Sequence, residues 1–154
     1  MPLALVSNSF TNGGLIPPQY TIDGENRSPL LRWSALPQGT RSLALIMEDP
    51  DAPRGTFVHW VIYNLPNTSR ELPEAISKSP TIRDLATQGM NDFRKLGYDG
   101  PLPPPGKLHG YVFHLYALSL EPNLPPGLTA AQLREKMQNK ILEEAQYVGR
   151  FQRY

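Results

Sequence analysis

Short apolar runs separated by turn-forming residues make up most of the chain. Residues 42–49 ("SLALIMED") are nearly all apolar, which is typical of a strand covered on both faces. The runs at 57–64 ("FVHWVIYN") and 111–120 ("YVFHLYALSL") are rich in aromatic and β-branched residues, so they also predict strands. A long stretch rich in proline and glycine, roughly 65–110, separates these two runs. Short strands with many turns predict a mainly β protein.

A helical pattern is clearest near the carboxy end. Thr129 stands in the N-cap position, and Gln132 follows it at the spacing of a capping box. From Leu133 an apolar stripe recurs at helical spacing, and Gly149 is the expected end of the helix. The stripe comprises Leu133, Met137, Ile141, Leu142, Ala145 and Val148. We therefore predict an antiparallel β-sandwich with small flanking helices and a C-terminal amphipathic helix that docks on a sheet.

The composition narrows the class of protein. The length of 154 residues suits a single domain that spans residues 1–154. The chain has no cysteine, which excludes disulfides and cysteine-ligated zinc, and its net charge of +1 gives no reason to expect a nucleic-acid partner. No apolar run approaches the ~18 residues of a membrane span, and the amino terminus is a poor signal peptide. We therefore expect a cytoplasmic protein without membrane insertion.

Strand alternation predicts which side chains share a face. In 57–64 two sets are expected, one of Phe57, His59, Val61 and Tyr63 and the other of Val58, Trp60 and Ile62. In the run that begins near residue 109, His109 and Tyr111 share a face, so both can contribute to one site. His114 lies on the opposite face, and we interpret it as a packing or surface residue.

A short acidic and proline-rich loop ("DPDAPRGTFV") connects the first two strands. It is short enough for Asp49 and His59 to face each other at adjacent strand ends. Asp49 is equally well explained as a site residue or as the acceptor of a local Asx-type turn, whereas Asp51 is better explained by the turn. The bond between Ala52 and Pro53 is a candidate cis peptide.

A second proline cluster ("GPLPPPGKLHG") precedes His109. Its prolines fix the backbone and remove donors, while residues such as Leu102 keep a free amide. Two interpretations stay open for this loop. It is either a cradle of amides for an anion or simply a stiff connection.

The quoted motifs resemble a known family. "DPDAPRGTFVHWVIYNLP" followed by "GYDGPLPPPGKLHGYVFHLYALS" is similar to the phosphatidylethanolamine-binding protein family, and "HWVIYNLP" looks like its bacterial and archaeal Raf-kinase-inhibitor-like branch. "GENRSPLLRW" and "YVGRFQRY" resemble its terminal blocks, so the similarity covers nearly the whole chain. The resemblance implies a β-sandwich with a small anion pocket. The implied pocket residues are Asp49, His59, Leu102 (through its amide), His109 and Tyr111.

The resemblance also implies a function. The family is known for binding small anions and phosphate-bearing headgroups, and individual members are described as protease or kinase inhibitors. We therefore expect a non-catalytic protein without a cofactor that binds a small anion or phosphate-bearing ligand, with a protease or kinase as a possible partner. A homodimer stays open, because Trp33 and Tyr154 suit a core or an interface, whereas Trp60 better suits the core. The family's usual "HRY" is "HGY" here, so Gly110 replaces a basic residue.

Two chemical expectations follow. A carboxylate beside the imidazoles is expected to raise their pKa and to favour charge-assisted bonds to an anion. The alternative function is a metal-dependent or other hydrolase that uses Asp49, His59 and His109, because these residue types can form a facial metal triad. The sequence lacks the Gly-x-Ser-x-Gly nucleophile motif and a His-x-x-x-His spacing, which favours the anion.

Overall fold

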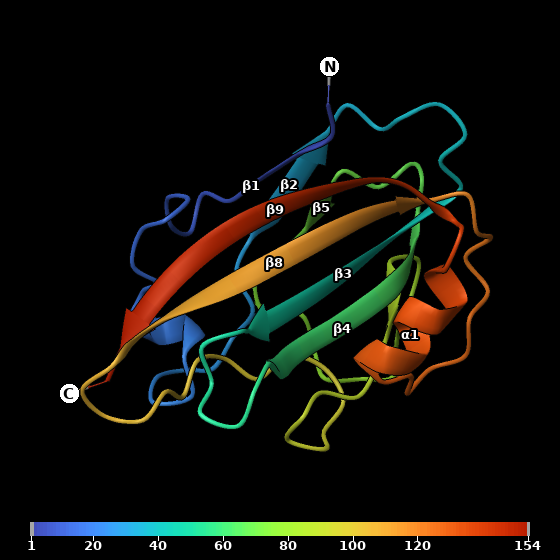
Figure 1. The fold of residues 1–154 in the computed structure, drawn as a ribbon. Coiled ribbons are helices and arrows are strands. Elements are labelled where there is room, and N and C mark those ends of the chain that lie inside the picture. Colours follow the sequence, from blue (N-terminus) through green and yellow to red (C-terminus); the bar gives the residue numbers. More distant parts are fainter. Residues whose placement is uncertain (1, 154) are drawn as a thin grey trace.

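The computed structural model describes residues 2–153 and arranges them in two antiparallel sheets (Figure 1). The smaller sheet has the order β1–β2–β5 and the larger one the order β6–β7–β4–β3–β8–β9. The strands are β1 (Ala4–Val6), β2 (Leu31–Ser34), β3 (Ser42–Asp49), β4 (Phe57–Pro66), β5 (Glu71–Leu72), β6 (Thr81–Ile82), β7 (Ala86–Gln88), β8 (Leu108–Leu118) and β9 (Ile141–Gln152). The helices are the 3-10 helix η1 (Pro18–Tyr20) and α1 (Ala130–Met137). The prediction of a mainly β, antiparallel fold is confirmed.

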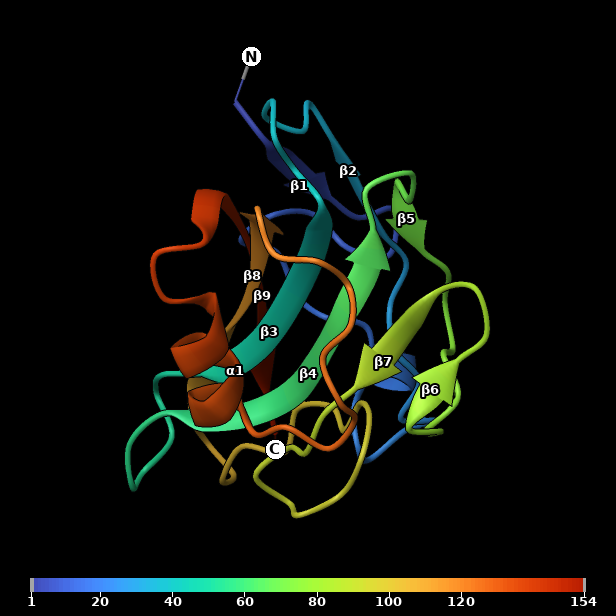
Figure 2. The same cartoon turned by 90° about the vertical axis from the view of Figure 1, so that its right-hand side faces the viewer.

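Apolar side chains fill two cores, which separate three layers: the smaller sheet, the larger sheet and α1. One core lies between the two sheets, where Trp33 of β2 joins Met47 of β3 and Phe113 of β8. A second core lies on the other face of the larger sheet, where Ile46 of β3 joins Leu133 of α1. Figure 2 shows α1 lying against β3 and β4. β3 is therefore buried on both faces, as its continuous apolar run predicted.

Two bulges interrupt the alternation of β4. The pairing between β3 and β4 passes over His59, which is the extra residue of the first bulge. The second accompanies Asn64, whose φ is 57°. The faces predicted for 57–64 are therefore wrong beyond His59, because an extra residue reverses the alternation that follows it. The α1 side carries Val58, Val61 and Tyr63, and the core between the sheets carries Trp60, Ile62 and Leu65.

The predicted C-terminal helix is correct only in its first part. The capping box is present, since the Gln132 amide donates to the Thr129 hydroxyl and the Thr129 amide donates to the Gln132 side chain. The helix ends at Met137, and Asn139 adopts a left-handed conformation with φ of 64°. The chain then continues as β9.

β9 pairs with β8 along nearly the whole of both strands, which lie side by side in Figure 1. Ala145 and Tyr147 point into the core between the sheets at the two-residue spacing of a strand. Gly149 does not end a helix. A Cβ atom at Gly149 would lie 2.4 Å from Cγ1 of Ile16, so glycine allows Ile16 to pack against the strand backbone. The open edge of β8 gives this segment a ladder partner, and that pairing outweighs the helical spacing of its apolar residues.

Three further expectations can be compared with the structure. The bond between Ala52 and Pro53 is trans, so the predicted cis peptide is wrong. Trp33 and Trp60 are both buried in the core, which leaves neither ring for an interface, and Tyr154 lies outside the described residues. Within residues 2–153, neither helix has the length and apolar character needed to cross a bilayer.

Candidate ligand-binding pocket

A pocket of about 180 Å³ opens where β3 ends, β4 begins and the loop before β8 approaches them. Its lining consists of Asp49, Ala52, Pro53, Phe57, His59, Phe93, Leu102, Pro103, Pro104 and His109. Tyr111 is fully buried and packs against both imidazoles, with ring centroids 5.3 Å from His59 and 6.4 Å from His109. The fold thus brings together all five residues that the sequence nominated. Their contact with a ligand stays a prediction.

The Asp49 carboxylate uses both oxygens within the protein. Oδ2 accepts a hydrogen bond of 2.6 Å from Nδ1 of His109, and both side chains are almost completely buried. Oδ1 accepts a hydrogen bond of 2.8 Å from the Asp51 amide. Asp49 therefore combines the two roles that the sequence left open, a local turn and a site contact. Its hydrogen-bond partner is His109, not the His59 ring that we expected it to face.

Asp51 does not make the local turn predicted for it. Its Oδ2 accepts a hydrogen bond of 2.8 Å from the amide of Gly110 in β8. This contact joins the acidic loop to the strand that carries His109 and Tyr111. Asp51 therefore helps to hold the two halves of the pocket together.

His59 is positioned by the first bulge of β4 and by a backbone contact. Its Nδ1 lies 2.7 Å from the carbonyl oxygen of Asp99, and its ring centroid lies 5.1 Å from that of Phe57 and 5.6 Å from that of Phe93. Burial lowers the pKa of His59 below its ordinary value, and the Asp99 carbonyl and the Asp49 charge offset this only in part. The Asp49 carboxylate thus acts on the His59 pKa in the direction that the sequence predicted, but burial outweighs it and the net shift is downward.

Tyr111 contributes a buried hydroxyl. Within residues 2–153 this hydroxyl has no hydrogen-bond partner. Burial, and then the nearby Asp49 carboxylate, raise the pKa of Tyr111 well above its ordinary value. The phenol therefore keeps its proton and is a hydrogen-bond donor. A buried donor without a partner is costly, which is a reason to expect that a ligand or a water molecule satisfies it.

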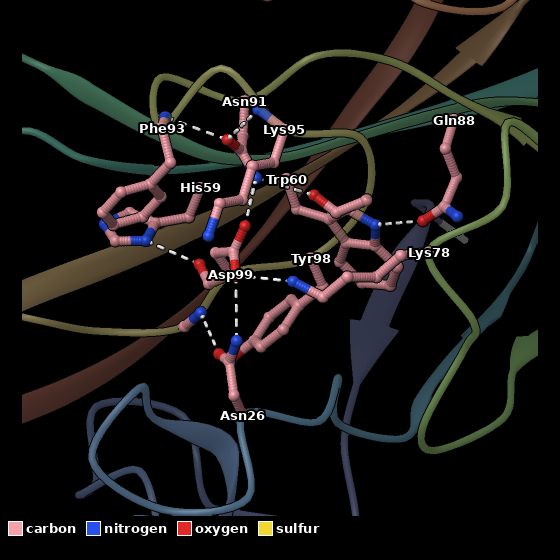
Figure 3. Close-up of polar contacts among 12 residues, drawn as sticks. Asn26, His59, Trp60, Lys78, Gln88, Asn91, Phe93, Lys95, Tyr98 and Asp99 are labelled. Carbon is pink, nitrogen blue, oxygen red and sulfur yellow. Dashed lines mark hydrogen bonds and ion pairs between the residues drawn. The ribbon is translucent and has the colours of Figure 1, made fainter.

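Asp99 lies at the centre of a buried network behind His59 (Figure 3). Its Oδ1 accepts hydrogen bonds from Asn26 at 2.8 Å and from Lys78 at 2.5 Å, and its Oδ2 accepts one from Asn91 at 2.8 Å. Burial alone would raise the pKa of Asp99, but these three hydrogen bonds outweigh it and lower the pKa. The carboxylate thus connects three loops, while the carbonyl of the same residue holds the His59 ring.

Sequence reasoning missed several residues of this site. Phe57 and Phe93 line the pocket, and Asp99 positions His59 without lining it. Phe57 shares the predicted face of His59, so strand parity was a usable signal. Phe93 and Asp99 come from the long loop before β8, where no periodicity indicates which side chains turn inward.

The arrangement does not suit the alternative of a metal triad. Both oxygens of Asp49 are engaged by protein donors, and one of those donors is the His109 ring. His59 directs Nδ1 to a carbonyl oxygen. Among residues 2–153, no group of three or more histidine, aspartate or glutamate side chains is arranged to hold a metal ion.

Comparison with known proteins decides the family. The family model described as phosphatidylethanolamine-binding protein matches residues 6–152. The chain belongs to the phosphatidylethanolamine-binding protein family. A "UPF0098 protein" of Aquifex aeolicus is 46% identical over 153 residues, covering 98% of this chain and 89% of the relative. A "UPF0098 protein" of Methanothermobacter thermautotrophicus is 44% identical over 149 residues, covering 97% and 98%.

Two solved structures of the phosphatidylethanolamine-binding protein family share the fold. The homologue CT736 of Chlamydia trachomatis has a TM-score of 0.89 at 35% identity, and the alignment covers 99% of both chains. Escherichia coli YbcL has a TM-score of 0.92 at 29% identity and covers all of both chains. The family and its sandwich fold are therefore established for this chain, whereas the ligand is not.

His114 of this family member lies outside the pocket, on the opposite face of β8. Its Nε2 lies 3.0 Å from Oε1 of Glu48 in β3, and its Nδ1 lies 2.9 Å from Oε2 of Glu144 in β9. Arg134 of α1 also contacts Oε1 of Glu48, at 3.0 Å. Burial alone would lower the pKa of His114, but the hydrogen bonds to the two carboxylates outweigh it and raise the pKa. The prediction that His114 has a packing role on the other face agrees with this position.

This cluster predicts a specific pH dependence of stability. Because the pKa of His114 is higher in the folded than in the unfolded chain, its stabilisation is complete below about pH 6.5 and is lost as the pH rises through the folded pKa. We expect the free energy of unfolding in urea to fall by roughly 1 kcal/mol over that rise. The His114→Gln variant should lack this component. His59, whose pKa is lowered in the folded chain, has the opposite effect on stability. Its contribution makes the free energy of unfolding rise with pH, and only below about pH 6.5. Equal pH profiles for the two proteins would contradict the assignment.

Proposed function

We propose that this chain is a non-catalytic binding protein whose pocket takes a small phosphate-like anion, such as a phosphate-bearing headgroup. One observation carries the proposal. The imidazoles of His59 and His109 are both held at Nδ1, so the Nε2 atom of each remains for a ligand, and both rings pack against Tyr111, whose buried hydroxyl has no hydrogen-bond partner among residues 2–153. Three polar atoms of this kind suit an anion with several oxygens.

The size and lining of the pocket support a small ligand. At about 180 Å³ it is smaller than the ~300–1,000 Å³ typical of sites for drug-sized molecules. Phe57, Phe93 and Pro103 give it an apolar wall beside the polar floor. Such a wall suits the short methylene chain of a headgroup, while the imidazoles bind its anionic end.

The wider role is part of the same proposal. Family membership supports a role as an inhibitor of a protease or kinase or as a modulator of signalling, and the pocket would then be the place where a small anion affects the partner. A homodimer and a cytoplasmic location stay predictions from the sequence.

Substitution of His109 tests the pocket directly. We expect His109→Ala to weaken binding of phosphoethanolamine at pH 6 by at least about tenfold, because the variant loses a ligand contact and leaves Asp49 buried without its partner. Isothermal titration calorimetry measures the affinity. The matched control is His114→Ala, on the opposite face of the same strand, which should bind like the original protein. Unchanged binding in His109→Ala, or no binding by the original protein, would show that the proposal is wrong.

A further inference from the structure

The hydrogen-bond geometry fixes the direction of the bonds that His59 can make. A backbone carbonyl only accepts hydrogen bonds, so Nδ1 of His59, 2.7 Å from the Asp99 oxygen, carries the hydrogen. In the neutral ring, Nε2 then has a lone pair and accepts a hydrogen bond. The ligand-facing nitrogen of His59 is therefore an acceptor, which is unusual in a pocket for an anion.

The Asp99 segment cannot easily turn its carbonyl away. The Asp99 amide donates to the His59 carbonyl oxygen at 3.2 Å, so the two residues are joined in both directions. The Asp99 side chain is held by Asn26, Lys78 and Asn91, as Figure 3 shows. Hydrogen bonds within the protein thus fix the tautomer of His59 independently of any ligand.

The surroundings of His59 also disfavour a charged ring. Burial lowers its pKa, and the rings of Phe57, Phe93 and Tyr111 surround it. The titratable or charged groups that face it or its carbonyl partner are Asp49, Asp99, Lys78, His109 and Tyr111. The two carboxylates are each engaged elsewhere, Asp49 by His109 and Asp99 by Lys78. Their negative charges still favour a protonated ring, but burial outweighs them.

We propose that the pocket selects an anion that itself carries a proton, so that a monoanionic phosphate ester donates its P–OH hydrogen to Nε2 of His59. This inference rests on the proposed function and names its ligand class. The Tyr111 hydroxyl donates to an unprotonated oxygen of the same phosphate. A sulfate ester carries no such hydrogen near neutral pH, and its oxygen lone pairs would face the lone pair of Nε2. The pocket therefore discriminates phosphate esters from sulfate esters of the same shape.

The proposal requires proton uptake at alkaline pH. A phosphate monoester loses its second proton with a pKa of about 6, so at pH 8 the dianion predominates in solution. Binding of the monoanion then takes up one proton from the buffer for each ligand bound. No covalent bond other than the O–H bond forms, and the buffer acid is the proton source.

Methyl phosphate and methyl sulfate form a matched pair of probes, because their monoanions have the same charge and nearly the same shape, and only the phosphate monoanion carries an acidic hydrogen. At pH 6 we expect titration calorimetry to show methyl phosphate binding more tightly by roughly tenfold to a hundredfold, since sulfate leaves the buried acceptor unpaired. At pH 8, titrations in buffers of different ionisation enthalpy should give about one proton taken up per methyl phosphate bound. The His59→Gln variant, whose amide can also donate, should lose most of this selectivity.

The outcomes separate this inference from the proposed function. Equal affinity for the two esters, or methyl phosphate binding without proton uptake at pH 8, overturns the inference and leaves an anion pocket standing. Equal proton uptake with methyl sulfate also overturns it, because the proton would then reside on the protein. Binding of neither ester shows that the proposed function itself is wrong. The measurements on the original protein decide between these results even if His59→Gln does not fold.

Discussion

Asp99→Ala is expected to lower the free energy of unfolding by about 3 kcal/mol, because three buried or half-buried donors lose one charged acceptor. The donors come from Asn26, Lys78 and Asn91, so the substitution also releases three loops from one another. Urea denaturation monitored by circular dichroism measures the change. The same variant should disturb His59, since the carbonyl that holds Nδ1 belongs to residue 99. Nitrogen chemical shifts of the His59 ring should show loss of the single Nδ1–H tautomer.

Lys78→Met is the matched control for this prediction. Lys78 pairs with the same carboxylate, but its side chain is 46% exposed, whereas that of Asp99 is 4% exposed. Removing a half-exposed cation should cost about 1 kcal/mol or less and should leave the His59 tautomer unchanged, because Asn26 and Asn91 still hold Asp99. A cost for Asp99→Ala no larger than that for Lys78→Met would show that the network does not stabilise the pocket.

The pattern of apolar and polar residues was sufficient to predict the three strands that carry the pocket residues. The apolar run of β3, the aromatic run of β4 and the run of β8 each occur where the sequence places a strand. Parity within β8 correctly separates His109 and Tyr111 from His114. These assignments succeed because alternation along one strand is a local property, and burial in two cores enforces it.

The errors arise where distant parts of the chain decide the outcome. The segment that becomes β9 has apolar residues at helical spacing, but the edge of β8 supplies it with a partner strand. The bulge at His59 depends on the register between β3 and β4, which alternation within β4 alone does not reveal. Asp49 pairs with His109 because β3 lies between β4 and β8, a strand order that no single stretch of sequence encodes.

At Gly100, the residue after Asp99, two segments of backbone lie in close contact. A Cβ atom at Gly100 would lie 2.1 Å from the carbonyl oxygen of Tyr20 and 3.0 Å from Cα of Thr21. The Gly100 amide also donates to Oδ1 of Asn26 at 2.7 Å. Glycine is required here for the close approach of two backbones. The pocket rim is thereby held against the residues that follow η1.

Gly100→Ala is therefore expected to lower the free energy of unfolding by about 3 kcal/mol or more, because backbone atoms on both sides of the contact must move apart. The control is Gly110→Ala. A Cβ atom there meets Oδ2 of Asp51 at 3.5 Å and Cγ1 of Val148 at 3.9 Å, which are ordinary contacts, so the change should stay within about 0.5 kcal/mol. This comparison also tests whether the Gly110 of "HGY" is a structural requirement. Similar urea midpoints for the two variants would contradict the close contact at Gly100, whereas a large loss confined to Gly100→Ala would show that the backbone behind His59 tolerates no added side chain.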